Sequence, residues 1–108
     1  MSPAYLLTPR AIDDLDSIWA YIAQDNAAAA DRVEAAIFTA CERLARYPLL
    51  GSRRPDVTPH ALRFWPVSRF PNYVIVYRPE SKPLQVVAVL HRRRDTGRIM
   101  AERQHGKS

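Results

Sequence analysis

Residues 62–91 read LRFWPV-SRFP-NYVIVYR-PESKP-LQVVAVLH, which are three β-prone segments separated by two short breaks. Valine, isoleucine and aromatic residues dominate these segments, as is typical of strands. Strands that are joined by short turns pair antiparallel. The last segment is apolar at both sets of alternating positions, so we expect it in the interior of the sheet. The stretch therefore predicts a small antiparallel sheet.

The first half of the chain predicts a short strand at residues 4–7 and then two helices. Thr8 is a favourable N-cap, and Pro9 fits the first helical position. Asp25 and Asn26 interrupt the apolar periodicity, separate the helices and can cap the second one, which ends near Tyr47 because Pro48 follows. The two apolar stripes are Ile12, Leu15, Ile18, Trp19 and Ile22 in the first helix, and Ala30, Val33, Ile37, Ala40 and Leu44 in the second.

The predicted fold is of the α+β class with the order β-α-α-β-β-β, a helical hairpin packed on one face of a small antiparallel sheet. Residues 49–61 are expected to form a loop because glycine and proline punctuate them. The opposite face of the sheet is expected to be shallow and basic. Residues 1–96 form the single domain of this prediction, and residues 97–108 form a short basic C-terminal tail that is in part compatible with a helix.

Length and composition restrict the class of protein. A chain of 108 residues provides one modest core. No apolar run reaches the roughly 20 residues of a membrane helix, and the N-terminus lacks the pattern of a signal peptide. The single cysteine, Cys41, cannot form an internal disulfide, and its place near the second apolar stripe predicts a buried side chain. We therefore expect a cytoplasmic protein without membrane contact.

The charge of the chain is uneven. Residues 1–50 carry four arginines against seven acidic residues, a net charge of −3, whereas residues 51–108 carry twelve basic residues against four acidic ones, a net charge of +8. This distribution favours a one-sided positive surface. Most of the cations are arginine, whose planar guanidinium suits carboxylates and phosphates. A coding bias toward arginine and alanine explains the same composition equally well.

The sequence contains no pattern for a metal or a cofactor. His60, His91 and His105 lie too far apart for a zinc motif, so we expect neither a metal nor a cofactor. Metal-free RNA cleavage would need an acid, a base and cations at the phosphate. The residues of suitable type are His91, Tyr73, Tyr77, Arg63 and Arg78.

A simpler interpretation of this region needs no catalysis. It makes His91 a hydrogen-bonded residue at the sheet edge or beside Asp95, and makes Arg92, Arg93 and Arg94 a solvated strand end. If the strand continued past His91, Arg93 would share its face and the two other arginines would lie opposite.

Five fragments in this order resemble a known family. They are Leu15-x-x-Ile18-x-x-Tyr21-Ile22, Leu44-x-x-Tyr47-Pro48-x-x-Gly51, Arg63-Phe64-x-x-Val67, Tyr73-x-Ile75-x-Tyr77 and Val89-Leu90-His91-x-Arg93-x-Asp95. Together they resemble the ParE branch of the RelE/ParE toxin superfamily, over nearly the whole chain to about Asp95. The fold of that family has the β-α-α-β-β-β order derived above.

The resemblance implies a toxin of a type II toxin–antitoxin module, a plasmid stabilization protein that a ParD-like antitoxin neutralises. The toxin would meet operator DNA only through the antitoxin. ParE-type toxins act on DNA gyrase, whereas RelE-type relatives cleave mRNA on the ribosome. Lys82 and Lys107 are the only lysines and no tyrosine follows His91, which favours the branch without nuclease activity. The expected function is therefore a gyrase-directed toxin that has no catalytic residues.

Two alternatives stay open at this point. One is a ribosome-dependent mRNA endoribonuclease that uses His91 with Arg63 and Arg93. The other is a degenerate member of the family that only binds an antitoxin-like partner and DNA.

Two sets of residues are the candidates for binding. The expected target-binding residues are basic and lie in the second half of the chain: Arg63, Arg78, His91, Arg92, Arg93 and Arg94. The expected antitoxin-binding residues are large aromatic side chains that a core of this size does not enclose, and such exposed patches mark partner sites. They are Trp19, Tyr21, Trp65 and Phe70.

Overall fold

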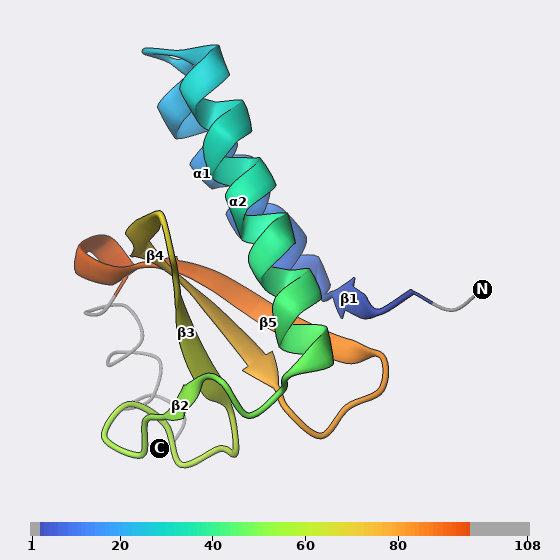
Figure 1. The fold of residues 1–108 in the computed structure, drawn as a ribbon. Coiled ribbons are helices and arrows are strands. Elements are labelled where there is room, and N and C mark those ends of the chain that lie inside the picture. Colours follow the sequence, from blue (N-terminus) through green and yellow to red (C-terminus); the bar gives the residue numbers. More distant parts are fainter. Residues whose placement is uncertain (1–2, 96–108) are drawn as a thin grey trace.

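A computed structural model describes residues 3–95, in which a helical hairpin covers one face of a five-stranded sheet (Figure 1). The hairpin is long, and its loop end projects beyond the sheet (Figure 1). In chain order the elements are β1 (Tyr5–Leu7), α1 (Pro9–Ala23), α2 (Ala27–Arg46), β2 (Ser52–Arg53), β3 (Arg63–Val67), β4 (Phe70–Arg78) and β5 (Leu84–His91). The predicted α+β class and the hairpin on a sheet are confirmed.

Both helices begin at the capping residues that the sequence indicated. The Thr8 hydroxyl accepts a hydrogen bond from the amide of Ala11 at 3.2 Å, and the Asn26 side chain accepts one from the amide of Ala29 at 3.0 Å. Each bond satisfies an amide that has no partner within the helix. The second helix ends at Arg46, with Tyr47 as its C-cap.

The core lies between the hairpin and the sheet. All five residues of the predicted stripe on α2 are buried, and Cys41 is buried beside them. On α1 the stripe is shifted: Ala11 is buried, whereas Ile12 is 47% exposed. The predicted place of Ile12 in the core was therefore wrong. The periodicity alone did not distinguish these neighbours, because both are apolar.

The sheet has the order β1-β5-β4-β3-β2. Strands β3, β4 and β5 pair antiparallel, as predicted, and β5 lies between β1 and β4 in the interior. Strand β2 adds an antiparallel pair with β3 that the sequence did not indicate. The expectation of a wholly antiparallel sheet needs a correction, because β1 pairs parallel to β5, with Leu6 opposite Gln85. The helical hairpin and three strands separate β1 from β5 in the chain, so no tight turn forces them to run in opposite directions.

Two boundaries also differ from the predictions. The expected loop at residues 49–61 contains the two-residue strand β2, with Ser52 opposite Phe64. In addition, β4 begins at Phe70 and not at Asn72, so the turn before it falls at residues 68–69. Pro71 is tolerated inside β4 because it lies near the start of the strand, opposite a register shift at Val67.

The loop after α2 is held to the sheet by the buried side chain of Tyr77. Its hydroxyl donates to the carbonyl of Pro48 at 2.6 Å and accepts from the amide of Gly51 at 2.9 Å. Arg63 donates to the carbonyl of Gly51 at 2.6 Å. A Cβ atom on Gly51 would lie only 2.7 Å from the Tyr77 hydroxyl, so the close approach requires glycine.

The face of the sheet that carries no helix differs from the shallow basic surface that we expected. Val76, Ala88 and Leu90 are buried there, and Leu62, Phe64 and Val87 pack against them. Val76, Ala88 and Leu90 are adjacent in sequence to Ile75, Tyr77 and Val89, which face the helices. The centre of this face is therefore apolar, and its arginines lie at the margins.

We expect Cys41 to resist alkylation in the folded protein. Its side chain is fully buried on α2, and burial raises the pKa of the thiol to about 12, so the reactive thiolate is scarce at pH 8. Iodoacetamide labelling followed by mass spectrometry should show slow modification without denaturant and rapid modification in guanidinium chloride. Equal rates under the two conditions would contradict the burial of this residue.

None of the helices within residues 3–95 has the length and apolar character that a membrane span requires. The predicted basic tail at residues 97–108, and a helix within it, lie outside the described residues, and the domain boundary at residue 96 stays a prediction.

Candidate functional site

Strand β5 ends at His91, and residues 92–95 adopt a helical backbone. We call these four residues the arginine turn. The His91 Nδ1 atom accepts a hydrogen bond from the amide of Arg94 at 3.2 Å, and the Asp95 carboxylate accepts one from the amide of His91 at 2.6 Å. This reciprocal arrangement resembles a capping box, in which side chains satisfy free amides at a helix start.

The strand does not continue past His91, so the alternation considered for the three arginines does not apply. Because the backbone bends at His91, Arg93 does not follow it on one face of a strand. The cause is the pair of hydrogen bonds from His91 and Asp95, which favours a helical turn over extended backbone. Asp95 is accordingly buried, whereas the three arginines are exposed.

The arginines of the turn have different surroundings. Arg94 lies over the ring of Tyr21 on α1, with 5.5 Å between its Cζ atom and the ring centroid, which is the geometry of a cation–π contact. Arg92 lines a pocket on the helix-free face of the sheet. The turn is therefore attached to the hairpin on one side and borders a pocket on the other.

The surroundings of His91 favour a structural role. The Tyr73 ring meets the imidazole edge-on, with 5.4 Å between the ring centroids and an angle of 83°. Burial raises the pKa of the Tyr73 phenol, while the charge of Arg94 acts in the opposite direction. The phenol therefore stays protonated near neutral pH and is a poor general base. One imidazole nitrogen is already engaged in capping the arginine turn.

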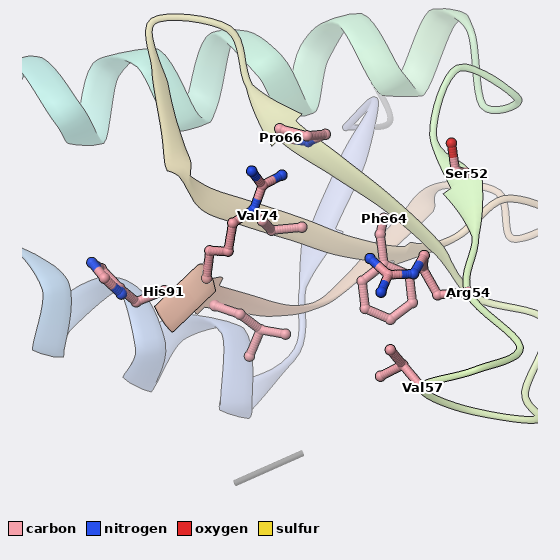
Figure 2. Close-up of a pocket in the computed structure, with 9 residues that line it drawn as sticks. Ser52, Arg54, Val57, Phe64, Pro66, Val74 and His91 are labelled. Atoms are coloured by element: carbon pink, nitrogen blue, oxygen red, sulfur yellow. The ribbon is translucent and has the colours of Figure 1, made fainter. Parts of the chain in front are cut away.

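The pocket beside the turn has a volume of about 290 Å³ and lies between β3, β4, the end of β5 and the loop after β2. Figure 2 shows His91 at one end of it, and Arg54, Val57 and Phe64 at the other. Arg54 is already engaged, because it makes two hydrogen bonds to Asp56, at 3.1 and 2.9 Å. The lining residues are Ser52, Arg54, Val57, Phe64, Pro66, Val74, Leu90, His91 and Arg92.

The structure brings together only some of the candidate target-binding residues. His91 and the arginines that follow it share one end of the sheet. Arg78 lies at the other end, since Tyr73 is paired with His91 and Arg78 with Gln85, about 17 Å away along β4. Arg63 lies nearer to Arg78 and holds the loop after α2.

A second surface lies between α2 and the turn that joins β3 to β4. It is a groove of about 420 Å³ in which Trp65 and Phe70 form part of an apolar wall opposite the alanine-rich face of α2. Three arginines border it: Arg32, Arg43 and Arg69. We call it the α2 groove. Two of the four candidate antitoxin-binding residues therefore meet in one place.

The other two candidates lie on α1. Trp19 is 36% exposed and donates from its indole nitrogen to Asp31 of α2 at 2.9 Å, which ties the two helices together. Tyr21 is 63% exposed and lies under Arg94. These two side chains line neither the α2 groove nor the pocket beside the turn.

Several of these residues could not be found from sequence. Ser52, Arg54 and Val57 belong to a loop whose course follows from tertiary contacts, and Phe64 was expected only as a strand residue. For the α2 groove, a signal was present in the sequence but was not used. That signal is the position of Arg32 and Arg43 off the apolar stripe of the second helix. Within residues 3–95, no group of three or more His, Cys, Asp or Glu side chains is placed to hold a metal ion.

Comparisons with known proteins can now be set beside this geometry. Residues 5–96 match the family model described as ParE toxin of the type II toxin–antitoxin system parDE. The chain belongs to the ParE toxin family. It is 40% identical over 84 residues to Y4kP of Sinorhizobium fredii, whose name describes a candidate toxin; the match covers 78% of this chain and 82% of Y4kP.

The ParE-family fold is also found in a solved structure. A chain from a structure titled "Chromosomal ParDE TA system from P. aeruginosa" superposes with a TM-score of 0.66 at 22% identity. The alignment covers 81% of the present chain and 92% of that chain. At this identity the likeness supports the fold of the ParE toxin described here.

Proposed function

We propose that this ParE-family chain inhibits growth in the bacterial cytoplasm by binding DNA gyrase, without catalysis of its own. The observation that carries the proposal is the arginine turn, in which His91 and Asp95 set the backbone that bears three exposed arginines. Cations on a set backbone beside an apolar pocket suit recognition of a protein surface. The gyrase target itself comes from the family resemblance.

Two observations support binding over RNA cleavage. The Nδ1 atom of His91 is used to cap the arginine turn, and burial raises the pKa of the neighbouring phenol, Tyr73. A cleavage reaction needs a base and an acid with pKa values near the working pH. Arg63, which the nuclease alternative would use, holds a loop carbonyl at the far end of the sheet.

Induction of the chain in growing bacteria tests this function. Gyrase inhibition predicts filamentation and a DNA damage response, with translation continuing during the first minutes. The endoribonuclease alternative predicts a rapid arrest of translation and new mRNA 5′ ends that primer extension detects. Early translation arrest without a damage response would reject the gyrase proposal.

We further propose that a ParD-like antitoxin neutralises the toxin by covering the α2 groove, and that DNA is reached only through that antitoxin. The groove has the apolar wall that a partner segment needs, and its three arginines favour an acidic segment. Neither sheet edge is well suited to strand addition. The edge strands β1 and β2 are only three and two residues long, so parts of β5 and β3 extend beyond them. In those parts Asp14 and Asp95 accept the amides of Val89 and His91 on β5, and Pro66 on β3 has no amide hydrogen.

Charge reversal at the groove should weaken antitoxin binding. We expect Arg43→Glu to raise the Kd about tenfold or more, since a charge-assisted contact contributes about 1.5–3 kcal/mol. Arg46→Glu is the matched control, because Arg46 is an exposed arginine in the last turn of α2 that does not line the groove. Calorimetry with the antitoxin encoded beside the toxin would measure both. Equal effects of the two changes would place the antitoxin elsewhere.

A further inference from the structure

The pocket beside the arginine turn has a floor and a rim of different character. Side chains of the helix-free sheet face form its floor, among them Phe64, Val74 and Leu90. Arg92 and His91 lie at the rim, where β5 gives way to the turn. Its volume of about 290 Å³ is close to the lower end of the range for small-molecule sites, so it accommodates one side chain and not an extended segment.

The fold sets the backbone that carries Arg92 at the rim. The hydrogen bonds from Arg94 to His91 and from His91 to Asp95 set the backbone of residues 92–95, and the contact between Arg94 and Tyr21 attaches that turn to α1. A cation whose backbone is fixed loses less conformational freedom on binding than one on a loose terminus. Arg92 is therefore placed to meet a carboxylate that arrives together with an apolar group.

The composition of the pocket favours a protein ligand over a nucleic acid. A site for single-stranded RNA or DNA combines a track of cations with several exposed aromatic rings. Among its described lining residues this pocket has two arginines, Arg54 and Arg92, and two cations do not make such a track. Phe64 is the one phenyl, phenol or indole ring among them. The imidazole of His91 meets Tyr73, which packs against the core on the other face of the sheet.

From this geometry we propose that the pocket receives an apolar side chain of the target protein that lies next to a carboxylate, with Arg92 pairing the carboxylate and with His91 and Asp95 acting as positioning residues. The site rests on the proposed function in that the target is taken to be gyrase. It goes beyond that function in naming the part of the toxin that meets the target and the chemical group that it recognises.

A fragment experiment on the full chain tests the pocket without gyrase. The probe is hydrocinnamate, a phenyl ring linked to a carboxylate, and its neutral amide is the matched ligand. Titrations followed by methyl NMR should shift Val57, Val74 and Leu90 in a saturable way, with the carboxylate binding several-fold more tightly than the amide. Arg92→Ala should abolish that preference. Arg53→Ala should retain it, because Arg53 is exposed and adjacent in sequence to the pocket but does not line it.

Two variants of His91 test whether this residue positions the arginine turn. His91→Asn keeps a side chain that can accept the Arg94 amide, since asparagine is a favourable N-cap, whereas His91→Ala removes the acceptor. We expect hydrogen exchange at the Arg94 amide to accelerate at least several-fold in the alanine variant and much less in the asparagine variant. The preference for the carboxylate should decline in the same order. Equal exchange in the two variants would reject a capping role for His91.

The remaining outcomes distinguish the inference about the pocket from the proposal that gyrase is the target. Saturable shifts at the pocket methyls with adenosine monophosphate, stronger than those with hydrocinnamate, would replace the protein ligand by a nucleotide and overturn this inference. Absence of saturable shifts with all probes would overturn the pocket itself. If hydrocinnamate binds as expected but purified gyrase subunits do not bind the toxin, the inference about the pocket survives and the gyrase target is rejected.

Discussion

Replacing Tyr77 by phenylalanine should destabilise the protein strongly although it removes one oxygen atom. The Tyr77 hydroxyl is the partner of the Pro48 carbonyl and the Gly51 amide, and both bonds are lost together. A buried polar group left without a partner costs about 1–3 kcal/mol, so we expect a total loss of about 2–4 kcal/mol in the free energy of unfolding. Urea denaturation followed by circular dichroism would measure it.

Two variants show whether this loss arises from the clamp on the loop. Tyr47→Phe removes the hydroxyl of an exposed tyrosine that directly precedes Pro48 in the chain, and it should change the free energy of unfolding by less than about 0.5 kcal/mol. Gly51→Ala introduces a Cβ atom 2.7 Å from the Tyr77 hydroxyl and should be destabilising by about 1–3 kcal/mol. A stable Tyr77→Phe protein would mean that the loop after α2 is held by other contacts.

Replacing Arg92, Arg93 and Arg94 together by alanine should weaken gyrase binding by far more than tenfold. Each contact that is desolvated in a complex contributes about 1.5–3 kcal/mol, whereas exposed cations contribute little to folding. We therefore expect a nearly unchanged unfolding free energy beside a large rise in the Kd. Affinity measured at two salt concentrations should also show a smaller salt dependence in the variant.

The triple variant also distinguishes the two surfaces of the toxin. Antitoxin affinity, which we assign to the α2 groove, should stay within a few-fold of the wild-type value. A variant that folds well and binds gyrase unchanged would show that the arginine turn is a solvated end of the sheet. A variant that loses the antitoxin and gyrase together would show that the two partners share one surface.

The sequence predicted those parts of the fold that depend on local chemistry. Thr8 and Asn26 were identified as caps because their side chains satisfy amides within the same turn, and the second helix ended where Pro48 requires it. The interior place of β5 followed from apolar residues on both of its faces. These features need no knowledge of the rest of the chain.

Features that depend on distant contacts were missed. The parallel pairing of β1 with β5 joins residues almost 80 positions apart, and β2 forms only because β3 offers a free edge to Ser52 and Arg53. The bend at His91 is a local feature of a different kind: the sequence could place His91 beside Asp95, but a strand pattern does not reveal that this contact turns the backbone. The same holds for the functional surfaces, because sequence could name arginines and aromatic residues but not sort them between a turn, a pocket and a groove.

The most direct test of the central claim is inhibition of purified gyrase by the purified toxin. In a supercoiling assay the toxin should inhibit at concentrations comparable to that of the enzyme, and the antitoxin should restore activity. Messenger RNA incubated with the toxin and ribosomes should remain intact. Undisturbed supercoiling at a large excess of folded toxin, together with cleavage of the mRNA, would contradict the account and favour a ribosome-dependent endoribonuclease.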